Sequence, residues 1–249
     1  MDHDRTTAQK IILWALVAMA ALFTVINIIL KFFPGVEFED TLLNVSQTGE
    51  TTLYTGEKYK SDITIAVTPE GKGSRVELTI GDTIDHTYRV VFPGGTIQSG
   101  FGYTYDRLTV TCNDRVIFDG GYNPNASELA TYCDLDGGIT VLGYGQVSYP
   151  GSSDPWYGYE LSHFEVMNFA NGPEPTTRGS WVHYGIALFC SIVCAVAVAF
   201  PYTLFELRYH WSVKDPEPTE FYLRMNELGG GIAAVALLIV YIVGVTKIV

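Results

Sequence analysis

The chain is short of basic residues. Its 249 residues include 15 Lys and Arg against 27 Asp and Glu, which gives a net charge of −12 at pH 7. The deficit lies in one segment, because residues 32–180 hold 20 acidic and 8 basic side chains, and 8 − 20 = −12. A segment of this charge repels the polyanionic backbone of a nucleic acid, so we exclude nucleic acid as a partner.

Asp, Glu and Arg are absent from three long apolar runs, which are Ile11–Leu30, Trp181–Phe205 and Leu228–Ile248. About 20 helical residues cross a membrane core of roughly 30 Å, and each run is long enough to do so. The runs therefore predict three transmembrane helices that contact the lipid bilayer. The lack of acids and arginines inside them argues against a channel or a transporter.

These runs divide the chain. The predicted segments are an N-terminus at 1–10, transmembrane helices at 11–31, 181–205 and 228–249, a large domain at 32–180, and a loop with a short interfacial helix at 206–227. The first run has a rival interpretation, because Ala18-Met19-Ala20 resembles a signal-peptide cleavage site. The apolar residues continue to Leu30, further than secretory signals require, so a retained helix is favoured.

Basic residues flanking the runs predict the orientation. One group comprises Arg5, Lys10, Arg208, Lys214 and Arg224, and the other comprises Lys31, Arg178 and Lys247. Three spans place each group on its own side of the membrane, and the positive-inside rule makes the side of the larger group cytoplasmic. We therefore predict a multi-pass protein of the cell membrane, with residues 32–180 and the C-terminus outside the cytoplasm.

The large domain has the alternation of β-strands. Apolar residues recur at every second position in four stretches, at Ile63, Ile65 and Val67, at Val76, Leu78 and Ile80, at Tyr88, Val90 and Phe92, and at Leu108, Val110 and Cys112. Turn sequences such as Pro93-Gly94-Gly95 and Pro150-Gly151 separate the stretches. No stretch of ten residues has a helical period, so we predict an all-β domain folded as an antiparallel β-sandwich.

The four cysteines form two pairs in the sequence. Cys112 and Cys133 lie in the large domain, where an oxidising environment favours a disulfide over two separate buried thiols. Cys190 and Cys194 lie one helical turn apart in the second apolar run. No other ligand is available at their depth, so we interpret these two as small packing residues rather than a metal site.

Small residues form a stripe along the second apolar run. Ala187, Ser191, Ala195 and Ala199 recur at every fourth position, and Gly229-Gly230-Gly231 opens the third run. Small residues let transmembrane helices approach closely where hydrophobicity gives no drive to associate. The stripe predicts either an antiparallel hairpin of the last two helices or a docking face for a helix of another membrane protein.

The loop between the last two runs carries a helix-start signal and a motif. Asp215 before Pro216 predicts an N-cap and a first helical residue. The motif comprises Trp211, Lys214, Glu217, Pro218, Thr219 and Tyr222, spaced W-x-x-K-x-x-E-P-T-x-x-Y. With the apolar helices around it, it resembles a family of small, uncharacterised bacterial membrane hairpins. The resemblance covers the last quarter of the chain, implies a bacterial cytoplasmic membrane and brings no known activity.

The large domain offers no catalytic constellation. His86 and His163 lie in no nucleophile elbow and no HExxH array. Glu160 and Glu165 fall on opposite faces of a predicted strand, so they cannot act as a pair. Asp134 and Asp136 resemble the start of a calcium loop, although the default interpretation is a solvated acidic turn. We predict no cofactor and favour a protein that is not an enzyme.

Aromatic residues crowd the loops of the large domain beside glycines and acids. The candidates for stacking on a sugar are Tyr103, Tyr105, Trp156, Tyr157 and Tyr159. The same pattern is typical of structural tyrosines in a twisted β domain. Two function classes follow. The first is a non-catalytic membrane protein that displays its domain for protein interaction or sensing, with another membrane protein as partner. The alternative is a cell-surface protein that binds polysaccharide.

Overall fold

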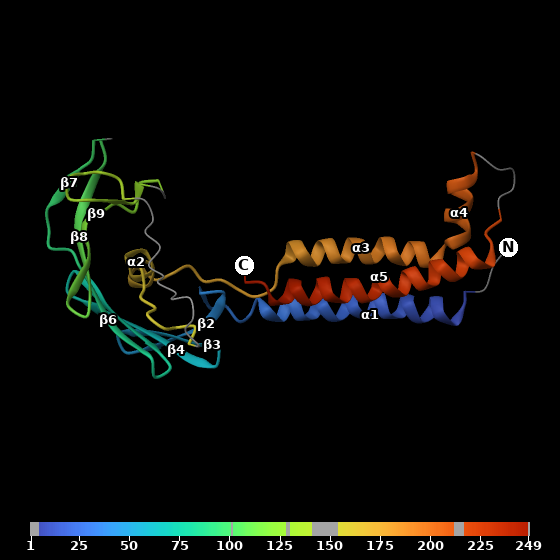
Figure 1. Ribbon diagram of the computed structural model, residues 1–249, viewed down its shortest axis with the longest axis horizontal. Helices are drawn as coiled ribbons and strands as arrows, with labels where there is room; N and C mark the ends of the chain where they lie inside the picture. Colours follow the sequence, from blue (N-terminus) through green and yellow to red (C-terminus); the bar gives the residue numbers. More distant parts are fainter. Residues whose placement is uncertain (1–4, 101, 128–129, 141–153, 212–216, 249) are drawn as a thin grey trace. The chain divides into compact units, whose positions relative to one another are not determined.

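The computed structural model divides the chain into two compact units (Figure 1). A helical unit contains Met1–Pro34 and Thr176–Val249, and a β unit contains Gly35–Pro175. The structure describes residues 1–249 except 1–4, 101, 128–129, 141–153, 212–216 and 249. The boundary follows the change in composition, because the apolar runs fall in one unit and the acidic segment falls in the other.

The helical unit contains four described helices. They are α1 (Thr7–Leu30), α3 (Trp181–Ala199), α4 (Pro201–Tyr209) and α5 (Glu220–Thr246). Among the described residues, α1, α3 and α5 are long and apolar enough to cross a membrane, and they lie side by side in Figure 1. Pro201 lacks an N–H to continue α3, so α4 starts there as a separate helix.

Side-chain caps start the three long helices. Thr6 and Gln9 form a capping box at α1, and Ser180 accepts a hydrogen bond from the His183 N–H at α3. Thr219 caps α5 in the same way by accepting from the Tyr222 N–H. Asp215 and Pro216, where a helix start is predicted, lie outside the described residues. The described helix α5 begins at Glu220 and continues without a break into the third apolar run.

Polar contacts between the long helices add to their packing. Ser191 Oγ lies 3.2 Å from Tyr241 Oη and also donates to the Ala187 carbonyl at 2.8 Å. The Tyr241 ring stacks on Phe23 with 4.9 Å between centroids, and the Thr24 and Tyr184 hydroxyls share a hydrogen bond. These contacts join all three long helices, so the unit is a bundle rather than an isolated hairpin beside a separate anchor.

The β unit contains ten described strands and one helix. The strands are β1 (Val36–Phe38), β2 (Thr41–Thr48), β3 (Thr51–Lys58), β4 (Ser61–Glu70), β5 (Gly73–Ile80), β6 (Ile84–Val91), β7 (Thr96–Gln98), β8 (Thr104–Cys112), β9 (Arg115–Tyr122) and β10 (Tyr132–Cys133). The helix is α2 (His163–Asn171). All the strand pairs are antiparallel, in the order β1-β2-β3-β4-β5-β6-β8-β9-β10, with β7 on β8.

The predicted alternation of apolar residues is confirmed. On the central strands, Ile63, Ile65, Val76, Leu78 and Tyr88 are buried, and their neighbours in sequence are more exposed. The register places Ile65 opposite Leu78 and Val76 opposite Tyr88, so these side chains share one face of the sheet. That face is the main hydrophobic core of the β unit.

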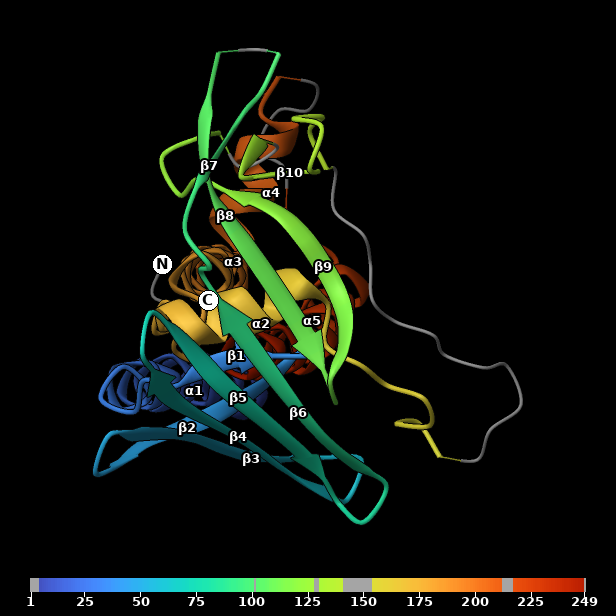
Figure 2. The same ribbon diagram turned by 90° about the vertical axis from the view of Figure 1, so that its left-hand side faces the viewer.

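In the described residues a helix covers this face, where the predicted β-sandwich would have a second sheet. The described strands form one continuous ten-stranded sheet, and α2 packs on β4, β5 and β6 (Figure 2). Val166, Met167 and Phe169 of the helix are buried in the core. The nine residues of α2 are too few to establish a helical period, so the alternation predicts the sheet but not the helix that covers it.

The predicted disulfide between Cys112 and Cys133 is wrong, because both side chains are buried free thiols. The strand register explains why. Cys112 lies opposite Arg115 at one end of β9, and Cys133 lies opposite Gly121 near the other end. This spacing corresponds to about 20 Å along β9, whereas a disulfide needs Cα atoms about 4.4–6.8 Å apart. Burial raises the pKa of both thiols and keeps them protonated.

We expect all four cysteines to be alkylated in denaturant without prior reduction, because the fold holds the two thiols of the β unit, Cys112 and Cys133, apart. Mass spectrometry of the full chain after labelling with iodoacetamide measures this directly. A chain with only two modified cysteines, and four after reduction, would contradict the register of β8, β9 and β10.

Candidate functional site

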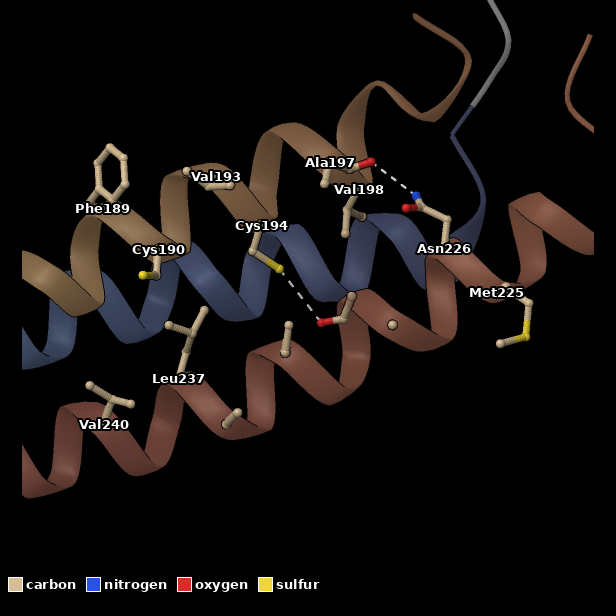
Figure 3. A pocket seen from close by; sticks show the side chains of 14 residues that line it. Phe189, Cys190, Val193, Cys194, Ala197, Val198, Met225, Asn226, Leu237 and Val240 are labelled. Carbon is tan, nitrogen blue, oxygen red and sulfur yellow. Dashed lines mark hydrogen bonds between the residues drawn. The ribbon is translucent and has the colours of Figure 1, made fainter. Parts of the chain in front are cut away.

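A groove lies between α3 and α5 in the helical unit (Figure 3). Its volume is about 580 Å³, and its walls are almost entirely apolar. The lining residues are Phe189, Cys190, Val193, Cys194, Ala197, Val198, Met225, Asn226, Gly229, Gly230, Ala233, Ala236, Leu237 and Val240. The α3 residues form one wall and the α5 residues form the other, so the groove follows the helix axes over several turns.

Small side chains keep the groove open. Cys190, Cys194 and Ala197 on α3 face Ala233 and Ala236 across it. These positions recur at three- and four-residue spacings, so each set lies on one face of its helix. Larger residues at the same positions would fill the volume.

Three consecutive glycines of α5 have different surroundings. A Cβ at Gly230 would lie 2.4 Å from Val198 Cγ2, so the packing of α3 on α5 requires a glycine there. A Cβ at Gly229 or Gly231 would meet nothing within 4 Å. Glycine in a helix costs about 1 kcal/mol relative to alanine. The contact with Val198 explains why position 230 is glycine. Packing within the chain does not explain the glycine at position 229, which lines the groove.

Two polar side chains of the groove make hydrogen bonds to backbone carbonyls. Asn226 Nδ2 donates to the Ala197 carbonyl at 3.0 Å, and Cys194 Sγ lies 3.9 Å from the Gly230 carbonyl. Among the described residues, no cluster of His, Cys, Asp and Glu could hold a metal ion. The groove therefore has the chemistry of a packing surface: it can accept an apolar chain or helix, and it offers nothing to activate a polar substrate.

The predicted stripe of small residues on α3 divides between two places. Ala187 and Ser191 are buried inside the bundle, where Ser191 bonds with Tyr241. Ala195 and Ala199 line a second groove of about 450 Å³ between α1 and α3. The stripe therefore serves the internal packing at its N-terminal end and lies on the bundle surface at its C-terminal end. A third groove, which includes Gly231, lies between α1 and α5.

The loop motif lies beside the start of α5. Thr219 is the N-cap, and the Tyr222 ring packs on Phe205 of α4 with 4.8 Å between centroids. Glu217 and Pro218 precede the cap, and Trp211 is 92% exposed. Lys214 and Asp215 lie outside the described residues. The capping and packing roles of Thr219 and Tyr222 give these two positions a structural explanation.

The comparisons with known proteins match only the end of the chain. Residues 186–244 match a family of unknown function (DUF6199), which covers about a quarter of the 249 residues. The match contains the loop motif and every residue that lines the groove between α3 and α5. It leaves out α1 and the β unit. No curated protein and no solved structure matches the chain.

The β unit buries three of the five aromatic residues predicted to bind a sugar. Trp156, Tyr159 and Tyr105 are 3%, 6% and 0% exposed. Trp156 packs at right angles to Tyr159, and the Tyr105 hydroxyl donates to the Ala130 carbonyl at 2.7 Å. Tyr157 and Tyr103 are exposed. The three buried rings therefore present no face on which a sugar could stack.

The acidic turn at Asp134 is organised by its own backbone. Asp134 Oδ1 accepts hydrogen bonds from the Asp136 N–H at 3.0 Å and the Gly138 N–H at 2.8 Å. This arrangement is an Asx-turn, which accounts for the aspartate without a cation. Glu165 is not on a strand as predicted, because it is the third residue of α2 and completes a capping box with Ser162.

His163, the first residue of α2, packs among aromatic rings of the β unit. Its ring stacks on Phe118 at 4.4 Å and packs against Tyr132 at 5.3 Å. Burial lowers the pKa of His163 to about 4. Its Nε2 is buried and has no hydrogen-bond partner among the described residues. As the first residue of α2, it also lies at the positive end of the helix dipole, which disfavours protonation further.

We expect the β unit to lose stability as the pH falls from 6.5 towards 4. The unfolded chain takes up a proton on His163 near pH 6.5, and the folded chain does so only near pH 4, so the contribution is intact above 6.5 and lost below 4. The loss is about 1–2 kcal/mol once solvent screening of the partly exposed ring is allowed for.

The variant His163→Phe keeps the stacked ring and removes the proton site. Its melting temperature is expected to fall less than that of the wild type between pH 7 and pH 4. Equal slopes for the two proteins would show that His163 is not a buried neutral group.

Proposed function

We propose that the chain is a non-catalytic, multi-pass membrane protein whose α3–α5 hairpin binds a transmembrane helix of another membrane protein. The observation that carries this proposal is the apolar groove between α3 and α5, with the unexplained Gly229 in its wall. Close packing is what drives helix association in lipid, and small residues allow it.

The extent of the family match supports the hairpin as the binding element. The grooves beside α1 include residues outside 186–244, such as Trp14 and Ala8, whereas the α3–α5 groove lies wholly inside the match. A binding role common to the family has to use the part of the chain that the family shares. The β unit, which lies outside the match, then gives this particular chain its own outer domain.

The β unit lies outside the cytoplasm in this proposal. Its support is the distribution of basic residues described above, with the larger group on the side of the N-terminus and the α3–α5 loop. There the acidic domain serves protein interaction or sensing. The carbohydrate-binding alternative is weaker, because only Tyr103 and Tyr157 of its five aromatic residues expose much of their rings.

We expect Gly229→Leu to reduce copurification of the membrane partner at least about fivefold, because the side chain fills the groove while the chain itself has room for it. The measurement is quantitative mass spectrometry of the chain purified from its native membrane in mild detergent. Gly231→Leu is the matched control, since it is the same substitution two residues away and faces the α1–α5 groove.

Gly230→Leu provides the contrast. It collides with Val198 and is expected to lower the melting temperature of the bundle, as overpacking costs about 1–3 kcal/mol. A bulky residue at Ser191 would likewise disturb the bundle itself, because Ser191 bonds with Tyr241 inside it. The proposed role of this groove would be contradicted if the wild-type chain purified without a partner. It would also be contradicted if Gly229→Leu and Gly231→Leu reduced copurification of the partner equally.

The orientation is tested by cysteine accessibility. Lys72→Cys lies in the exposed β4–β5 turn, and Arg208→Cys lies in α4. In intact cells, a membrane-impermeant maleimide is expected to label the first variant and to label the second only after permeabilisation. The wild-type chain measures the background labelling of the native cysteines, of which Cys112 and Cys133 are buried. The reverse labelling pattern would place the β unit in the cytoplasm.

A further inference from the structure

Three basic residues come from three separate segments at one end of the helical unit. Lys31 is the C-cap of α1, Lys247 is the C-cap of α5, and Arg178 lies just before α3. In Figure 1 the end of α1, the start of α3 and the end of α5 meet at this end of the bundle, beside the C-terminus.

Hydrogen bonds hold the three segments together. Lys31 Nζ donates to Thr177 Oγ1 at 2.5 Å, next to Arg178 in the chain. The Gly179 N–H donates to the Lys247 carbonyl at 2.8 Å, and an antiparallel β-bridge pairs Arg178 with Ile248. The three segments that carry the basic residues are therefore held to one another by hydrogen bonds.

Among the described residues of the helical unit, no carboxylate side chain lies near this cluster. The acids among those residues are Glu206, Glu217, Glu220 and Glu227, all at the other end of the bundle. Even Glu227 is about 30 Å from Lys247 by the rise along α5. None of the described carboxylates forms an ion pair with the three cations. Like charges gathered in this way attract an anion.

The surroundings of the cluster suit an amphipathic anion. Phe32 and Phe33 follow Lys31 and are 75% and 67% exposed, and Trp181 at the start of α3 is half exposed. Exposed aromatic rings at the ends of membrane-spanning helices lie at the level of the headgroups and the upper acyl chains. A free phosphate ion would bind the basic side chains but would not contact these rings, whereas a phospholipid can contact both.

We propose that Lys31, Arg178 and Lys247 form a site for the phosphate of an anionic phospholipid, whose glycerol and upper acyl chains lie against Phe32, Phe33 and Trp181. The inference rests on the membrane insertion assumed in the proposed function. The two ammonium groups supply point charges, and the guanidinium supplies a fork that can hold two phosphate oxygens.

The test uses the full chain in nanodiscs and measures its melting temperature. Phosphatidylglycerol is expected to raise it by several degrees over phosphatidylcholine, and the triple variant K31Q, R178Q and K247Q is expected to lose most of that shift. Native mass spectrometry is expected to show at least fivefold less retained phosphatidylglycerol in the variant. The matched control is the triple variant K10Q, R208Q and R224Q, which removes the same charge at the other end.

Each other outcome overturns the site. Equal losses in the two triple variants would indicate attraction to net charge alone. A shift produced by millimolar inorganic phosphate in phosphatidylcholine nanodiscs would assign the cluster to free phosphate. If the melting temperature of the triple variant K31Q, R178Q and K247Q fell equally in both lipids, the difference between the lipids would be retained, and the three residues would act only through contacts within the chain such as the Lys31–Thr177 bond. Flotation with phosphatidylcholine liposomes reports membrane insertion separately, so failure of the proposed function is seen as loss of flotation.

Discussion

The helical unit depends on the close approach of α3 and α5 at Gly230. Val198 occupies the space that a side chain at this position would need, since a Cβ would lie 2.4 Å from its methyl group. In lipid, apolar surfaces gain nothing by leaving the solvent, so helices associate through tight packing and hydrogen bonds. The approach at Gly230 is accompanied by the bond between Ser191 and Tyr241 and by the stacking of Tyr241 on Phe23 of α1. The same small residues that permit this contact leave a groove on the outer side of the pair, which is the basis of the proposed helix-binding role.

The β unit is stabilised by a different force. Its alternating strands bury one apolar face, and α2 covers that face with Val166, Met167 and Phe169. The segment before α2 is fixed by the Leu161 N–H, which donates to the Tyr88 hydroxyl at 2.8 Å in the core. Burial raises the pKa of that tyrosine well above its ordinary value, so it stays neutral. The domain therefore owes its stability to the burial of this apolar face away from water, and its two cysteines are free thiols.

Local patterns in the sequence predict the long helices and the strands because period and length are local properties. Ile63, Ile65 and Val67 are read correctly from their alternation. The order of the strands depends on contacts between distant residues, which is why neither the single sheet nor the separation of Cys112 from Cys133 follows from spacing. The helix α2 had a detectable signal in Ser162-x-x-Glu165, a capping box. The burial of Trp156 and Tyr159 has none, since an aromatic residue in a glycine-rich loop suits a core as well as a binding surface.

The most direct test of the hairpin's role is to identify what occupies the groove. A photoreactive amino acid at Ala233, which lines the groove, is irradiated in native membranes, and the same group at Ile242, exposed on α5 outside the lining residues, serves as the control. The account predicts a discrete protein adduct from position 233 and lipid adducts from position 242. Lipid adducts alone from both positions would show that the groove is filled by the bilayer, and would contradict a helix-binding function.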